Sequence, residues 1–312
     1  LETDIKSLKK AARQTIGPEL EKRIQIIVDT GLIELKNDFK IYWNSCPIAK
    51  LCTGNDYLSP NFDLIVDDIV EPVQKQKLYD YINNWLQNKI NLVLKSLIDL
   101  KNLKDKNSSV KALAFQLYEN NGVLKREQVS EYLKTLGQNE RKILRELGVK
   151  FGRYHVFLYQ LIKPEAVYLR TLLWKNFHQK YNNIQPPTFG LNFLDDKENK
   201  NKSFMLLCGF EKFDSLFVRI DILERLFMLI INSSESKQNK EIKLIPEMLN
   251  LLGCSKDNFK KLLQIMGYKI FDKENETFFK YSPIKRFKKI SKQKVSDENT
   301  FKVLKNLNLG KF

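Results

Sequence analysis

Four neighbouring residues between positions 150 and 155 combine positive charge with aromatic rings. Lys150 and Arg153 are cationic, and Tyr154 and His155 follow directly. Cations of this kind bind the phosphates of a nucleic-acid strand, and flat rings stack on its unpaired bases. The pattern therefore makes these four residues candidate contacts for a single strand.

His155 allows a second chemistry, general base catalysis. A catalytic base needs a nucleophile or a carboxylate partner close to it, and the residues next to His155 in the sequence supply neither. We therefore expect a hydrogen-bonded structural histidine in preference to a catalytic one. Gly148 is expected to end a helix and to lead into one continuous core strand, whose alternation places Lys150 and His155 on opposite faces.

A second basic cluster falls in a segment with the order of a winged helix-turn-helix. Residues 246–252 predict a short helix that ends at Gly253, and Ser255 is expected to cap a second helix. The segments YKIF and TFFKY then flank the polar turn DKENE as two alternating strands. Helix, tight turn, helix and two-stranded wing follow one another in winged helix-turn-helix domains.

The predicted second helix and wing carry a set of lysines that would face solvent. The helix presents Lys256, Lys260 and Lys261, and the wing adds Lys269, Lys273 and Lys280. All six are candidate phosphate contacts. Winged-helix units also serve as protein contacts or as rigid spacers in larger enzymes, so that interpretation of the segment stays open.

The charge of the whole chain supports a polyanionic partner. The 312 residues carry a net charge of +16, which favours RNA or DNA. Part of the lysine excess has another explanation, because lysine, asparagine and isoleucine are abundant throughout, as in proteins from AT-rich genomes. A third basic cluster, in the tail segment IKRFKKISKQK, adds candidate contacts at Lys285, Arg286, Lys288 and Lys289.

Motifs for catalysis and for metal binding are absent from the sequence. It contains no P-loop, no dinucleotide-binding glycine motif, no H-E-x-x-H and no G-x-S-x-G. The four cysteines form no C-x-x-C pair, which predicts free thiols rather than a zinc site. The pairs Asp67-Asp68 and Asp195-Asp196 are expected to be solvated loop or cap residues. We predict no catalytic residue and no metal site in this chain.

The hydrophobic periodicity predicts mainly helices with small β elements, an α+β fold class. No apolar run reaches the roughly 20 residues that a membrane helix needs. Helices are expected over 4–30, with a second helix starting at Pro18, and over 72–106, 109–120, 126–136, 138–147, 164–179 and 221–231. Strands are expected over 32–35, 39–43 and 47–51, ending in a loop at Gly54–Asp56, and 204–221 has strand-like composition.

Two segments share a local pattern that indicates a related pair of units. LRELGVKF (144–151) and LQIMGYKI (263–270) each combine a helix end and a glycine with a hydrophobic residue, a lysine and a second hydrophobic residue.

The chain is expected to divide into a helix plus β-hairpin element (1–65), a helical domain ending in a basic strand and helix (66–185), a linker with a small α/β segment (186–240), a winged-helix-like unit (241–283) and a basic tail (284–312).

The most specific block of the chain is LGVKFGRYHVFL (147–158) followed by LIKPEAVYLRTLLW (161–174). It resembles the region that follows the motor in ATP-dependent superfamily 2 helicases of alphaproteobacteria, relatives of the helicase of the mitochondrial RNA degradosome. The resemblance continues in NSCPIAKLCTGNDYLSP (44–60), CGFEKFDSLFVRIDILERL (208–226), IPEMLNLLGCS (245–255), MGYK (266–269) and ENTFKVLKNL (298–307). It spans nearly the whole chain in the order of that family.

The resemblance implies that the chain is the C-terminal accessory half of a helicase whose two RecA-like domains precede it. The Walker lysine and the arginine finger of those domains are not in this sequence, so no ATPase residue is carried over. ATP and magnesium are then expected in the upstream motor, with the helicase core as a partner in cis. By the same likeness, the cationic and aromatic residues of 150–155 contact a single strand. The glycines and Phe151 of that block are alternatively explained as positions that build a core.

These observations together predict a nucleic-acid-binding accessory region that guides single strands for an ATP-dependent helicase, with RNA expected before DNA. Leu1 in place of methionine indicates a processing point or the cut end of a longer enzyme. A nuclease of a degradosome-like complex is a candidate partner. The bacterial cytoplasm is the expected location, and the mitochondrial matrix is the alternative. Two other functions stay open: a stand-alone winged-helix DNA-binding protein, and a structural protein-contact module.

Overall fold

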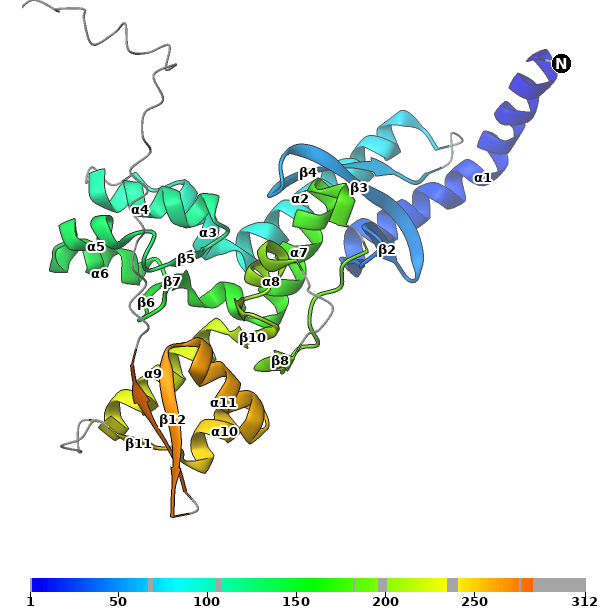
Figure 1. Ribbon diagram of the computed structural model, residues 1–312. Coiled ribbons are helices and arrows are strands. Elements are labelled where there is room, and N and C mark those ends of the chain that lie inside the picture. Colours follow the sequence, from blue (N-terminus) through cyan, green and yellow to red (C-terminus); the bar gives the residue numbers. More distant parts are fainter. Residues whose placement is uncertain are drawn as a thin grey trace, which may run out of the picture.

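The computed structural model describes residues 2–66, 70–104, 108–181, 183–195, 201–234, 241–274 and 276–282. In these residues helices alternate with four small antiparallel sheets, so the predicted α+β class is confirmed (Figure 1). None of the helices in this part of the chain is long and apolar enough to cross a membrane. Several predicted positions lie outside the described residues, namely Asp67, Asp68, Asp196, Lys285, Arg286, Lys288 and Lys289.

The N-terminal part joins one long helix to a four-stranded antiparallel meander. The helix is α1 (Glu2–Thr30), and the strands are β1 (Ile33–Leu35), β2 (Lys40–Trp43), β3 (Cys46–Asp56) and β4 (Ser59–Leu64). The second helix predicted to start at Pro18 is wrong, because α1 continues through the proline. Proline removes one N–H donor of the helix, whereas the residues of the turns on either side retain their N–H donors, so the helix continues.

The loop predicted at Gly54–Asp56 is also wrong. These residues belong to β3, which pairs with β4 as far as Asp56 opposite Ser59, with a register shift before that point. A Cβ atom on Gly54 would lie 1.9 Å from the carbonyl oxygen of Ser59. Position 54 therefore requires glycine because two strands approach closely at an irregularity of the sheet. The prediction instead took this glycine as the sign of a turn.

The helices that follow the meander begin where the sequence predicts. Helix α2 (Pro72–Val93) starts at a proline and buries one apolar stripe, Leu78, Ile82, Leu86 and Ile90. The predicted continuous helix to residue 106 is divided, since Leu94 separates α2 from α3 (Lys95–Lys101). The Leu94 N–H still bonds the Ile90 carbonyl, while the φ and ψ of Leu94, −104° and 21°, interrupt the helix.

After α3, one order of elements recurs in three consecutive segments, which we call unit 1 (108–158), unit 2 (164–219) and unit 3 (220–281). Unit 1 contains α4 (Ser108–Glu119), β5 (Val123–Lys125), α5 (Ser130–Thr135), α6 (Gln138–Glu146), β6 (Val149–Phe151) and β7 (His155–Leu158). Unit 3 contains α9 (Ile220–Ser234), β11 (Ile242–Lys243), α10 (Pro246–Leu252), α11 (Lys256–Ile265), β12 (Tyr268–Lys273) and β13 (Glu276–Tyr281). Both follow the order helix, strand, helix, helix, strand, strand.

Unit 2 keeps this order in its described residues with one helix between its first two strands. It contains α7 (Pro164–Phe177), β8 (Phe193–Asp195), α8 (Lys202–Leu207), β9 (Phe210–Phe213) and β10 (Leu216–Arg219), with the 3₁₀ helices η1 (Tyr159–Ile162) and η2 (Gln179–Tyr181) on either side of α7. In every unit the last strand lies in the middle of the sheet: β5-β7-β6, β8-β10-β9 and β11-β13-β12. The three units therefore share one topology.

A glycine with left-handed backbone marks the same point in each unit. Gly148, Gly209 and Gly267 have φ angles of +89°, +86° and +89°, and each stands two residues after a helix and one before a strand. Their N–H groups bond the carbonyl three residues earlier at 2.9 to 3.0 Å. The helix end, glycine and strand found at 144–151 and 263–270 thus recur around Gly209, where Glu211 stands in the position of the lysine.

Other boundaries differ from the predictions. The continuous strand expected after Gly148 is a hairpin, in which Lys150 of β6 faces Phe157 of β7, so the predicted alternation through His155 is wrong. The helix expected over 126–136 starts only at Ser130, because β5 precedes it. Residues 204–207, which have strand-like composition, lie in α8. Phe204, Met205 and Leu207 are buried there, which explains their apolar character.

The buried side chains form one large core and smaller ones at the C-terminal side. The large cluster runs from Ile24 on α1 to Leu173 on α7 and includes the interior of unit 1. A second cluster fills unit 3 and receives Phe193, Leu216 and Val218 from the unit 2 sheet. Val123, Phe157 and Ile220 form a small cluster of their own. Since these residues come from units 1 and 3, apolar contacts join the units.

Candidate nucleic-acid interface

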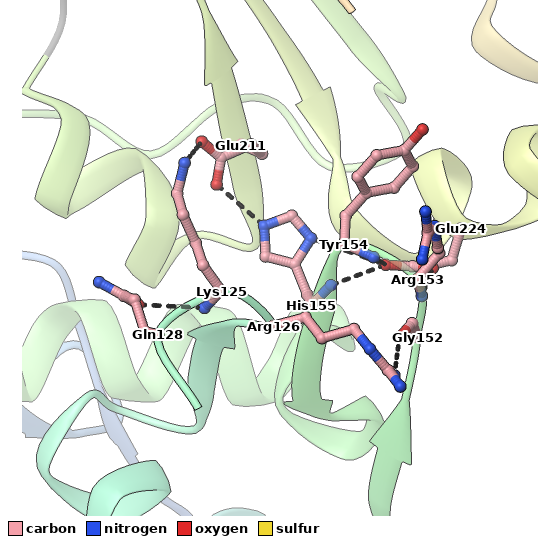
Figure 2. A network of polar contacts seen from close by, with 9 residues as sticks. All are labelled: Lys125, Arg126, Gln128, Gly152, Arg153, Tyr154, His155, Glu211 and Glu224. Atoms are coloured by element: carbon pink, nitrogen blue, oxygen red, sulfur yellow. Dashed lines mark hydrogen bonds and ion pairs between the residues drawn. The ribbon is translucent and has the colours of Figure 1, made fainter. Parts of the chain in front are cut away.

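The turn between β6 and β7 is held by one carboxylate from unit 3. Glu224 of α9 accepts hydrogen bonds from the backbone N–H groups of Arg153, Tyr154 and His155 at 2.5, 2.9 and 2.9 Å. Figure 2 shows the Glu224 side chain against this turn. Hydrogen bonds to a carboxylate are stronger than those between neutral groups. Burial raises the pKa of Glu224, but these bonds and His155 outweigh it, and the pKa is lowered overall.

Gly152 is the residue that lets the carboxylate reach the turn. A Cβ atom at this position would lie 2.3 Å from Cδ of Glu224. The turn is closed on its other side by Arg126, whose guanidinium donates to the Gly152 carbonyl oxygen at 2.7 Å. Gly152 therefore serves the docking of α9 onto unit 1.

His155 lies between two carboxylates that come from two different units. Its Nε2 is 2.9 Å from Oε2 of Glu211 on β9, and its Nδ1 is 3.7 Å from Oε1 of Glu224. Lys125 of β5 completes the network with a 2.7 Å bond to Oε1 of Glu211 (Figure 2). Burial lowers the pKa of His155, but the two carboxylates outweigh it and raise that pKa. Burial likewise raises the pKa of Glu211, which His155 and Lys125 lower overall.

This network accounts for His155 as a structural residue. The His155 and Glu211 side chains are 2% and 4% exposed, so neither has room for a substrate or a base to approach. The ring of His155 is therefore not presented to a nucleic-acid strand, contrary to its place among the candidate contacts. Its carboxylate partners follow 56 and 69 residues later. The residues next to His155 in the sequence therefore could not predict a partner.

Tyr154 is also used inside the protein. Its half-buried ring contacts Phe227 of α9 edge-on, with 5.5 Å between centroids, and packs against the unit 3 core. Burial and the nearby Tyr268 raise the pKa of its hydroxyl. We conclude that Tyr154 anchors unit 3 to unit 1 rather than offering a stacking surface.

The two cations of the same block remain at the surface. The side chain of Lys150 is exposed on β6 and makes no hydrogen bond or ion pair with another described residue. Arg153 is exposed as well, and its guanidinium lies 5.6 Å from the centroid of the Phe227 ring. The side chains of Lys150 and Arg153 therefore stay available for phosphate, with Lys150 on β6 and Arg153 in the turn that Glu224 holds.

Helix α11 of unit 3 has the form that the sequence predicts. Ser255 is its N-cap and accepts a hydrogen bond from the Asn258 N–H at 3.2 Å. Lys256 and Lys261 are exposed, whereas Lys260 is 28% exposed and lies 3.3 Å from both carboxylate oxygens of Asp272 on β12. Lys256 and Lys261 are consequently more available than Lys260 to bind phosphate.

Helix α6 of unit 1 occupies the equivalent position and was missed as a candidate. Its exposed side chains include Lys142 and Arg145, and Arg145 lies 5.7 Å from the centroid of the Phe151 ring. The signal was present in the repeated pattern at 144–151, which makes α6 the counterpart of α11. Helix α8 of unit 2 differs from both, because it has only six residues, carries a single lysine and packs its buried side chains in a cluster with Val167 of α7.

The described residues contain no group of three or more histidine, cysteine, aspartate or glutamate side chains that could hold a metal ion. The histidine–carboxylate pair of His155 and Glu211 is buried. Comparison of the chain with protein-family models, with curated proteins and with solved structures gives no match.

Proposed function

We propose that this chain binds nucleic acid through α6 and α11, as an accessory region that guides single strands for an ATP-dependent helicase. The observation that carries the proposal is the equivalence of these two helices. Each is the second helix of a helix–helix pair, is followed by a β-hairpin, and turns cations to solvent. That is the order of a winged helix-turn-helix, whose second helix contacts nucleic acid.

The charge of the chain supports the same proposal. A net charge of +16 raises the local concentration of a polyanion and speeds its association. Lys142, Arg145, Lys150, Lys256 and Lys261 are all exposed. Such cations contribute affinity without reading sequence, because they bind phosphate oxygens.

The helicase part of the proposal depends on the sequence resemblance. Under it, the motor domains lie in cis, bind ATP and magnesium, and move the strand that units 1 and 3 hold. RNA is the expected strand, and a nuclease of a degradosome-like complex is a candidate further partner. The winged-helix order also fits a stand-alone duplex-binding protein, and strand preference separates the two.

The test is binding of the 312-residue chain to labelled oligonucleotides, measured by fluorescence anisotropy at several salt concentrations. We expect oligo(U) and oligo(dT) single strands to bind more tightly than duplexes, with little dependence on sequence. Affinity should fall steeply between about 50 and 200 mM salt, because each phosphate contact releases counterions. Preference for one duplex sequence would favour the stand-alone protein, and no binding at low salt would refute nucleic-acid binding altogether.

Charge-removing variants assign the interface. Replacing Lys142, Arg145, Lys256 and Lys261 by alanine should lower the slope of log affinity against log salt by about 0.7 for each phosphate of a single strand that the variant no longer binds. The matched control is K77A/K111A, which removes two exposed lysines of α2 and α4 and should leave the slope unchanged. Equal slopes for the two sets of variants would show that α6 and α11 are not the interface.

A further inference from the structure

The three-stranded sheet of unit 3 has an inner face and an outer face of very different composition. Because side chains alternate along a strand, Tyr268, Thr277 and Phe279 point to the core, where all three are buried. The alternate positions form the outer face, namely Lys243 of β11, Lys269, Phe271 and Lys273 of β12, and Glu276, Phe278 and Lys280 of β13. This outer face therefore combines two phenylalanines with four lysines and one glutamate.

The two phenylalanines lie side by side in the middle of that face. Phe271 and Phe278 are direct cross-strand partners. Their rings are nearly parallel, with 11° between planes and 6.2 Å between centroids, and both are half-buried. The lysine Nζ of Lys273 lies 5.0 Å from the Phe271 centroid. Aromatic rings on the solvent side of a sheet are suited to stacking on another flat ring.

The lysines around the rings are not all balanced by carboxylates. Lys243 pairs with Glu276, and Lys273 pairs with Glu241 at 2.8 Å. Lys269 and Lys280 stand directly opposite each other across the hairpin and make no ion pair with any described residue. Like charges in directly opposed positions destabilise a hairpin, so an anion beside them would be favoured.

We propose that this outer face binds a single strand of nucleic acid, with unpaired bases stacked on Phe271 and Phe278 and a phosphate held by Lys269 and Lys280. The rows of Lys269–Lys280 and Phe271–Phe278 are two residues apart along the strands, about 7 Å. A duplex offers only its phosphates, because its bases already stack on one another. An unpaired strand offers both an anion and free ring faces, and it matches both features of this surface.

This inference rests on the proposed nucleic-acid binding and assigns its base contacts. The probes are oligo(dT), oligo(U) and a DNA strand of the same length in which the bases are replaced by abasic sites. We expect F271A and F278A each to weaken oligo(dT) and oligo(U) binding by about tenfold, in line with one stacked base. Binding of the abasic strand should be the same for both variants and the wild type. The two strand types show whether RNA or DNA is preferred.

The matched control is F115A, which removes an exposed phenylalanine of α4 and should change no affinity. F271L and F278L retain apolar bulk without an aromatic ring, so they should fold and still lose the base-dependent affinity. The pair K269A/K280A should weaken the abasic and the normal strand alike. If wild type binds and F271L and F278L match it on every strand, this inference is wrong while the proposed function stands. If wild type binds no strand, the proposed function fails first.

Discussion

At the scale of single residues, Glu224 connects unit 3 to a turn of unit 1. It accepts three backbone hydrogen bonds from the β6–β7 turn and lies beside His155. The turn belongs to unit 1 and the carboxylate to unit 3, so removal of the charge would leave three donors without their acceptor and a loosened contact between units. Gly152 matters only because that carboxylate is there.

We therefore expect E224A to lower the free energy of unfolding by about 2–3 kcal/mol, the usual effect of losing hydrogen bonds to a charged group. G152A should lower it by a similar amount, because its Cβ displaces the same carboxylate. The double variant should be no less stable than E224A alone, since both changes remove one set of bonds. Urea unfolding measures all three, with E247A on the exposed face of α10 as the control. Additive losses would contradict this account.

His155 should give the stability a defined pH dependence. Its pKa is raised above the usual 6.5, so its contribution is complete below about pH 6.5 and is lost as the pH rises through the folded-state pKa. Glu211 and Glu224 have pKa values lowered from 4.5. Their contributions are complete above about pH 4.5 and are lost as the pH falls through their folded-state values.

The difference in stability between wild type and H155N isolates the histidine. We expect this difference to be largest near pH 5.5 and to shrink toward pH 8.5, each about one to two units from the ordinary histidine pKa. Urea unfolding across that range measures it. A difference that is constant with pH would mean that His155 stays neutral between its carboxylates.

At the scale of elements, the sequence predicts those with strong local signals. Helices α10 and α11 have a proline start, a glycine end and a serine cap, and they lie where those residues place them. Strands β5, β8 and β11 have only two or three residues, too few to show alternation, and they were missed. Contacts across units, such as His155 with Glu211, depend on tertiary packing and carry no local signal.

The repeated glycines give an element-scale prediction. Gly148 and Gly209 have the same left-handed backbone, and a Cβ at either would meet no atom closer than 3.5 Å. Only the backbone strain of a left-handed non-glycine residue remains, so G148A and G209A should each lower the free energy of unfolding by about 1–2 kcal/mol. Thermal or urea unfolding tests this. Clearly unequal losses would show that the two positions are not equivalent.

At the scale of the whole molecule, units 1 and 3 each expose a basic helix, while the six-residue helix α8 of unit 2 buries Phe204, Met205 and Leu207. The pattern of charge in the sequence suggested nucleic acid but not this division. The arrangement follows from packing: Trp174 of α7 lies 5.9 Å from Phe204 of α8, ring to ring, so the middle helix is part of an interior. Unit 2 therefore contributes most of its helix α8 to a core, while units 1 and 3 contact each other directly through Glu224 and the β6–β7 turn.

The Glu224 contact has a consequence for how those two surfaces act together. A fixed connection between units 1 and 3 makes the chain a bivalent holder, in which the first site engaged sets the effective concentration of the strand at the second. A short oligonucleotide would occupy one site only and exchange quickly. Once a strand is long enough to reach both sites, its residence time should rise sharply. Binding would then depend on the length of the strand more than on its sequence.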